Sequence, residues 1–100
     1  MLKEDAYDFC LAMKEEVDEI AKAQMYRVSL ESVPAYYALS KHQTLLAFMM
    51  KSYPVTAWRL ATQISILVGP RYDDDDTDMM QRKHDCYYLI YEFFKEVMEG

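Results

Sequence analysis

The chain has 100 residues, of which 52% are hydrophobic and 28% are charged, a balance typical of a folded domain and not of a disordered chain. The formal net charge of −6 disfavours general binding to nucleic acid or to an anionic membrane surface. Only two glycines and three prolines are present, which argues against a turn-rich β sandwich or barrel. The length predicts a single helical domain over residues 1–100.

The N-terminal quarter has the pattern of one long amphipathic helix, from about Leu2 to Arg27. At about 100° per residue, its apolar positions fall on a single arc, formed by Leu2, Ala6, Phe9, Cys10, Met13, Val17, Ile20 and Ala21. A connection is predicted from Ser29 to Val33, because the residue before Pro34 is biased away from helical geometry. Proline itself suits the first turn of the helix that follows.

Two further helices are predicted on either side of a proline break. The first runs from about Pro34 to Ser52, with one face formed by Ala38, Leu39, His42, Leu45, Leu46 and Met49. Pro54 after Tyr53 then interrupts the pattern, since proline cannot donate a helical hydrogen bond. The next helix, from about Val55 to Val68, carries Arg59 as its one charge and is therefore expected in the centre of the bundle. Gly69 and Pro70 end it.

The last helix is predicted to follow the aspartate run, with Asp78 as the N-cap and Gln81 as its partner in a capping box. Its expected apolar face consists of Met80, Tyr87, Ile90, Tyr91, Phe94, Val97 and Met98. Its expected solvent-exposed face consists of Arg82, Asp85, Glu92, Lys95, Glu96 and Glu99. Four helices joined by short links predict an all-α, compact and mostly antiparallel four-helix bundle.

Charge is segregated along the chain. Residues 1–31 hold eight acids and four bases, residues 32–72 hold four bases and no acid, and residues 73–100 hold nine acids and three bases. The charges either balance one another at the rim of the bundle or form an acidic surface that attracts a basic partner. The second interpretation predicts these contact residues: Asp73, Asp74, Asp75, Asp76, Asp78, Glu15, Asp18, Glu19, Tyr72 and Tyr88.

The aspartate run also invites a metal interpretation, because hard cations bind carboxylate oxygens. Counted from Asp74, however, the sixth position is not glycine and the twelfth is Asp85 in place of glutamate, so the pattern is not that of a Ca²⁺-binding loop. We therefore expect a solvated loop that leads into the acid-favoured start of a helix, with no bound metal and no cofactor.

A second acidic string, Glu15-Glu16-Val17-Asp18-Glu19, lies within the first helix. It resembles the first half of the metal-binding pattern of the all-α nucleotide pyrophosphohydrolases of the MazG-like group, in which Glu-Glu-x-x-Glu on one helix shares Mg²⁺ with Glu-x-x-Asp on the next. The resemblance covers five residues and implies Glu15, Glu16 and Glu19 as ligands of a Mg²⁺-dependent nucleotide hydrolase. The predicted second helix has no acid, and the only similar spacing, Asp75 with Asp78, comes far downstream.

Other reactive side chains have structural interpretations. His42 lies in the apolar face of its helix and is expected to be a buried, hydrogen-bonded histidine. His84, Asp85 and Cys86 are consecutive, so they diverge around a helix and cannot converge on one atom. Cys10 and Cys86 are expected to be buried thiols that pair under oxidation only if they face each other.

The aromatic content is high, with nine tyrosines, four phenylalanines and one tryptophan. Most of these residues fit core spacing, but five fall away from the predicted core arcs: Tyr36, Tyr37, Phe48, Tyr72 and Tyr88. Exposed tyrosines beside carboxylates are typical of a protein-binding face, and self-association through the same face, as in a homodimer, is the alternative.

Together these features favour a small acidic, non-enzymatic protein that inhibits a basic or nucleic-acid-handling protein by stoichiometric contact. Phages, mobile elements and toxin–immunity systems encode proteins of this sort, anti-CRISPR proteins among them. The acidic first residues give no signal-peptide pattern, and residues 54–69 are too short to cross a bilayer, so we expect a cytoplasmic protein without membrane or direct nucleic-acid contact. The Mg²⁺-dependent pyrophosphohydrolase and a homo-oligomeric adaptor or structural protein are the alternatives.

Overall fold

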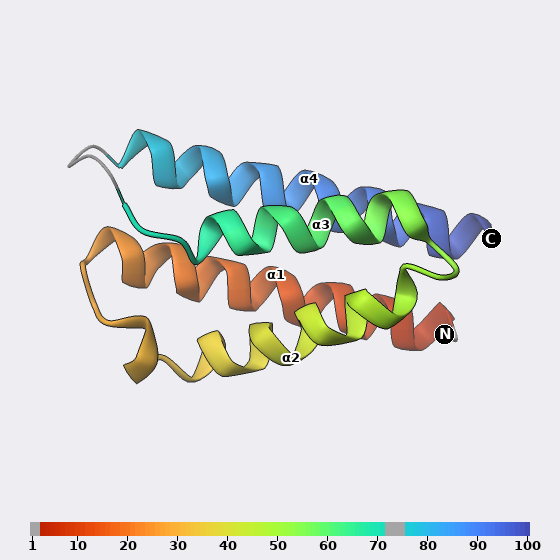
Figure 1. Cartoon of the computed structure of the whole chain (residues 1–100), viewed down its shortest axis with the longest axis horizontal. Coiled ribbons are helices and arrows are strands. Elements are labelled where there is room, and N and C mark those ends of the chain that lie inside the picture. Colours follow the sequence, from red (N-terminus) through yellow and green to blue (C-terminus); the bar gives the residue numbers. More distant parts are fainter. Residues whose placement is uncertain (1–2, 72–75) are drawn as a thin grey trace.

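The computed structural model describes residues 3–71 and 76–100, which form four α-helices and one short 3-10 helix. In chain order these are α1 (Lys3–Met25), η1 (Leu30–Ser32), α2 (Pro34–Met49), α3 (Pro54–Leu67) and α4 (Thr77–Glu99). Successive α-helices run in opposite directions along the long axis of the molecule (Figure 1). The predicted antiparallel four-helix bundle is confirmed.

The helices occupy the corners of a square. Helix α1 packs against α2 and α4, α3 packs against the same two helices, and α1 also touches α3 across the diagonal. The bundle therefore has an α1/α4 seam on one side and an α2/α3 seam on the other. In the view of Figure 1, α3 and α4 lie above α1 and α2. Each seam is a place where two rows of side chains meet at the surface.

The connections follow from local backbone chemistry. Arg27, just after α1, has a φ of 58°, and the amide of Val28 donates to Ala23 O at 2.9 Å, which closes the helix with a left-handed residue. Val33 is extended and precedes Pro34 at the start of α2, as predicted. The break before α3 is also confirmed, because Pro54 occupies its first turn, where the missing N–H costs nothing.

The core arc of α1 is confirmed: every predicted member from Ala6 to Ala21 is buried, while Leu2 lies outside the described residues. The predicted face of α4 is correct for Ile90 and Val97, which are buried, and wrong for other members. Its buried residues are Met79, Arg82, Cys86, Leu89, Ile90, Phe93 and Val97. Met80 and Tyr91, expected in the core, are exposed, and Arg82, expected in water, is buried. Helix α4 has two adjacent apolar rows, and the row centred on Phe93 lies between α1 and α3.

Three other expectations are corrected. Helix α3 is not central: it occupies one corner of the bundle, and Val55, Trp58 and Ile66 on its outer side are exposed. Leu45, expected in the core face of α2, is also exposed. The capping box at Asp78 is wrong, since α4 begins at Thr77 and its N-cap residue is Asp76, two residues before the predicted cap.

The two residues of that capping box have other partners. Asp76 is the N-cap residue of α4, and Asp78 pairs with Arg82 at 3.0 Å. The amide of Gln81 donates to Asp85 Oδ1 at 2.8 Å, one turn along the helix. The pairing partners therefore lie within α4 itself, and the predicted reciprocal cap is not formed.

Candidate functional site

The predicted acidic contact residues separate into groups. Tyr72, Asp73, Asp74 and Asp75 lie outside the described residues. Asp76 and Asp78 are exposed, and each meets an arginine: Asp76 Oδ1 lies 3.2 Å from Arg71 Nη2, and Asp78 Oδ2 lies 3.0 Å from Arg82 Nη2. Both arginines also donate to main-chain carbonyl oxygens, so these aspartates orient groups that hold the end of the bundle together.

The acids of α1 point in different directions. Glu15 and Glu19 are exposed, whereas Asp18 is half-buried on the side of α4, 3.9 Å from Lys14 Nζ. Asp18, Glu19 and Asp76 border one hollow at the α1/α4 seam, so the structure brings these three predicted residues together.

Tyr88 is exposed as expected but lies apart from that hollow, beside Arg59 and Asp85 on the α3 side of α4. Of the other aromatic residues predicted away from the core, Tyr37 and Phe48 are exposed, whereas Tyr36 packs against the core. The predicted contact residues therefore do not share one face.

The string from Glu15 to Glu19 does not converge on one point. Glu16 turns towards α2, where its Oε1 lies 2.6 Å from Nδ1 of His42. Burial raises the pKa of the Glu16 carboxyl, and the hydrogen bond to His42 offsets only part of that effect. His42 is half-buried and also meets the Phe9 ring edge-on, which agrees with its predicted structural role. Across residues 3–71 and 76–100, no three His, Cys, Asp or Glu side chains are grouped so that they could hold a metal ion.

An apolar groove with a volume of about 320 Å³ runs along the α1/α4 seam. It is lined by Tyr7, Cys10, Leu11 and Lys14 from α1 and by Tyr87, Ile90, Tyr91 and Phe94 from α4. We call these eight residues the α1/α4 groove. The volume lies at the lower end of the range for small-molecule sites and also suits one or two side chains of a bound protein.

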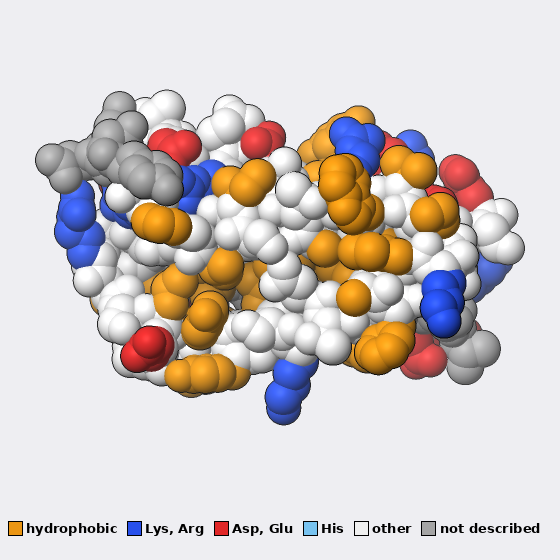
Figure 2. Space-filling view, in the orientation of Figure 1, with side chains coloured by type: hydrophobic (Ala, Val, Ile, Leu, Met, Phe, Trp, Pro, Cys, Tyr) orange, Lys and Arg blue, Asp and Glu red, His pale blue; other side chains and the backbone are white. Residues whose placement is uncertain are grey.

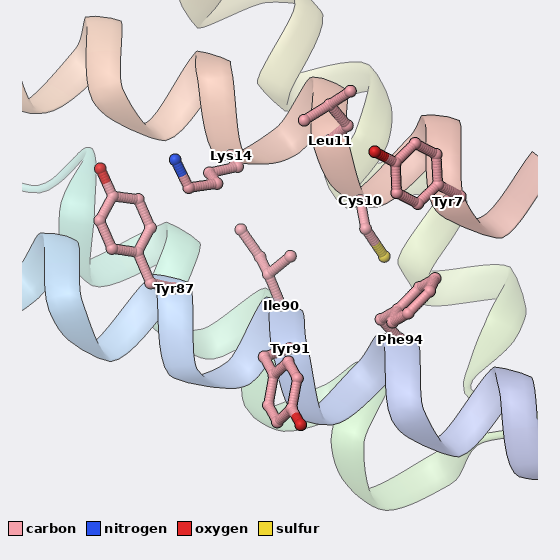
Figure 3. A pocket seen from close by; sticks show the side chains of 8 residues that line it. All are labelled: Tyr7, Cys10, Leu11, Lys14, Tyr87, Ile90, Tyr91 and Phe94. Carbon is pink, nitrogen blue, oxygen red and sulfur yellow. The ribbon is translucent and has the colours of Figure 1, made fainter.

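Each end of the groove is closed by one side chain from each helix (Figure 3). Tyr7 meets Phe94 at one end, with ring centroids 6.2 Å apart and the planes nearly perpendicular. At the other end Lys14 Nζ lies 5.0 Å from the centre of the Tyr87 ring. Cys10 points between the two helices. The groove therefore has an apolar floor and a rim that carries hydroxyl groups and one ammonium group.

Helical spacing explains why both walls are aligned. Tyr7, Leu11 and Lys14 are spaced i, i+4, i+7, and so are Tyr87, Tyr91 and Phe94. Because α1 and α4 are antiparallel, these two rows face each other along the seam. Sequence reasoning placed the second row in the core and missed the groove. One signal in the sequence could have indicated the groove. Helix α4 has two adjacent rows of apolar residues, and a single helix–helix interface cannot bury both rows.

The chemistry of the groove is that of a binding surface. Burial raises the pKa of the Cys10 thiol to about 12, so this sulfur is a protonated, weakly nucleophilic group at neutral pH. Cys86 does not line the groove; its Sγ lies against Gln63 O of α3 at 3.5 Å, and both cysteines are free. The two thiols therefore have different neighbours, Cys10 in the groove lining and Cys86 against α3.

Comparisons of this chain with protein-family models, with curated proteins and with solved structures find no match. Within the described part of the chain, no helix is both long enough and apolar enough to cross a membrane. The fold and the groove together define a small all-α bundle with an aromatic surface groove.

Proposed function

We propose that this chain is a non-enzymatic binding protein that acts by stoichiometric contact with a protein partner of basic surface. The observation that supports it best is the α1/α4 groove, in which aromatic and aliphatic side chains are left open between two helices. Tyrosine is enriched at protein interfaces, and tyrosine side chains around an apolar centre often contribute most of the binding energy there. In this proposal, apolar side chains of the partner fill the groove.

The basic character of the partner is inferred from the charges on the same two helices. Helix α1 holds seven acids and three bases, and α4 holds five acids and three bases. Exposed carboxylates such as Glu15 and Glu19 would steer a basic surface towards the groove and raise the association rate. Such a surface on the partner could be one that otherwise holds nucleic-acid phosphates, which is how binding would inhibit a nucleic-acid-handling enzyme in the cytoplasm.

The closer assignment to phage, anti-CRISPR or immunity-type inhibitors is an analogy from the small size, the acidity and the lack of a catalytic motif in the sequence. The proposed partner contacts include the aspartates of residues 73–76 together with Asp78. Converting residues 73–76 to asparagine tests this acidic corner separately from the groove. We expect weaker and less salt-sensitive binding, because fewer ion pairs form. Unchanged affinity would remove the corner from the interface.

The proposal is tested by affinity capture with tagged protein. The captured partner is then identified, and its molar ratio to the tagged chain is measured. The groove variant Leu11→Asp/Tyr91→Asp places charge on two exposed lining residues. Phe48→Ser, on the opposite side of the bundle, is the matched control. We expect wild type and the control to capture one basic protein at a fixed molar ratio and the groove variant to capture none. Equal capture by wild type, the control and the groove variant would contradict the proposal.

A further inference from the structure

A second apolar surface covers the side of the bundle opposite the α1/α4 groove. Phe48 of α2 is 71% exposed, and Val55 and Trp58 of α3 are 62% and 60% exposed. We call the surface formed by Tyr37, Phe48, Val55, Trp58 and Ile66 the α2/α3 face. Figure 2 shows hydrophobic side chains spread over this side of the molecule, with the charged side chains lying mainly towards the edges of the view. Large exposed apolar surfaces of this kind mark interaction sites.

The α2/α3 face is almost uncharged. Helices α2 and α3 contain no acidic residue, and their only formal positive charges are Lys41 and Arg59. Arg59 lies on the same side of α3 as Val55 and Ile66, four and seven residues away, and shares a hollow with Asp85 of α4. Covering this face therefore requires the desolvation of only a few ions, all of them positive.

The distribution of the acids favours one occupant, a second copy of the chain. Every described acid except Glu31 lies on α1, on α4 or at Asp76, and the whole chain has a net charge of −6. Two copies that meet through α1 or α4 bring like charges together. Two copies that meet through their α2/α3 faces keep those acids on the outer sides of the pair, where repulsion is weakest.

We propose that the α2/α3 face binds the same face of a second copy to form a two-fold symmetric dimer. The bundle extends 41 Å by 22 Å, an outline of roughly 900 Å² for one whole side, so a standard interface of ~800 Å² per partner would cover nearly all of that side. A two-fold axis parallel to the helices sets α2 of one copy against α3 of the other, with Phe48 near Trp58. Both α1/α4 grooves then face outwards, so the dimer presents two copies of that groove.

The test is sedimentation together with Trp58 fluorescence, because Trp58 is the only tryptophan in the chain. From about 1 µM to about 500 µM, we expect the mass to rise from 11.8 kDa towards twice that value, with the Trp58 emission moving to shorter wavelength in step. Phe48→Asp keeps the reporter and should weaken dimerisation at least about tenfold. Tyr91→Asp, on the groove, is the matched control and should leave dimerisation unchanged.

The outcomes that overturn the dimer are distinct from those that overturn the proposed function. A mass of 11.8 kDa with water-exposed Trp58 at every concentration overturns it, as does a dimer that survives Phe48→Asp or is lost in Tyr91→Asp. If Phe48→Asp loses helical circular dichroism, Val55→Asp replaces it. Added NaCl should leave an apolar dimer unchanged or strengthened, so weakening by salt would also contradict the proposal. Partner capture through the groove should persist in Phe48→Asp.

Discussion

The guanidinium group of Arg82 extends from α4 to the last turn of α3, where Nη1 donates a hydrogen bond to the carbonyl oxygen of Ile66 at 2.9 Å. The same side chain donates to Gly69 O at 3.2 Å and Pro70 O at 3.0 Å. Ile66 lies in the last turn of α3, where its carbonyl oxygen also accepts from the Gly69 amide at 3.1 Å, whereas Gly69 and Pro70 follow the helix end. A buried arginine thus supplies the donors that close α3, with Asp78 compensating its charge.

Arg82→Met is therefore expected to destabilise the fold by about 3 kcal/mol, since it removes the hydrogen bonds to Ile66, Gly69 and Pro70 and the ion pair with Asp78 while keeping most of the side-chain volume. Urea unfolding followed by circular dichroism measures the change. Lys83→Met, one residue along α4, is the matched control and should cost less than about 1 kcal/mol. Equal losses in the two variants would show that the network around Arg82 does not stabilise the end of α3.

The two apolar rows of α4 should respond differently to truncation. Phe93 is fully buried, whereas Tyr91 in the neighbouring row is 58% exposed. We expect Phe93→Ala to cost about 4 kcal/mol through lost burial and a cavity, and Tyr91→Ala to cost less than about 1 kcal/mol. Urea unfolding of the two variants provides the comparison. A larger loss for Tyr91→Ala than for Phe93→Ala would mean that the groove row belongs to the core.

Glu16 should make the stability depend on pH in a predictable direction. Burial raises its pKa above the ordinary value of 4.5, so between 4.5 and the raised pKa the folded state holds more protons than the unfolded state. The free energy of unfolding therefore falls as pH rises through this window. Urea unfolding between about pH 4 and pH 7 should show wild type losing stability relative to Glu16→Gln. Glu15→Gln, at the exposed neighbouring position, is the control.

A difference between wild type and Glu16→Gln that stays constant with pH, or that grows in favour of wild type as pH rises, would contradict this account of Glu16. The hydrogen bond to His42 gives a second readout. Its loss in Glu16→Gln should change the environment of the His42 ring, observed by NMR, while Glu15→Gln should leave that ring unaffected.

The buried thiols give a prediction at alkaline pH. Burial raises the pKa of both Cys10 and Cys86 to about 12 from an ordinary value of 9.0. The unfolded state loses these protons first, so the thiols make stability fall as pH rises above 9.0. Comparing wild type with a Cys10→Ala/Cys86→Ala variant between about pH 8 and pH 10 isolates the effect from other groups. A wild-type curve parallel to that of the variant would contradict it.

The sequence was sufficient to locate the helices but not to predict which face of each helix is buried. Helix α1 has one narrow apolar arc, so periodicity alone identified the residues from Ala6 to Ala21 that are buried. Helix α4 has apolar residues on two adjacent rows, and only the position of α3 decides that Phe93 is buried and Tyr91 is not. Arg82 looked like a surface residue because the carbonyl oxygens that it satisfies belong to another helix.

The groove depends even more on tertiary structure. Its two walls come from residues about 80 positions apart, Tyr7 with Phe94 and Lys14 with Tyr87, and only the antiparallel register of α1 and α4 brings them together. The acidic residues were identified correctly as surface groups in the cases of Glu15, Glu19 and Asp76. The hydrogen bond between Glu16 and His42 also required the packing of α1 against α2.

The central claim, that the α1/α4 groove is the surface that binds a partner, is tested most directly by an NMR titration of ¹⁵N-labelled protein with the captured basic protein. We predict that the backbone amide signals of Leu11 and Tyr91 shift or broaden until the partner reaches one equivalent per chain. The single indole N–H signal, from Trp58 on the opposite side, should stay in place. Shifts centred on Trp58 with Leu11 and Tyr91 unchanged would contradict the claim.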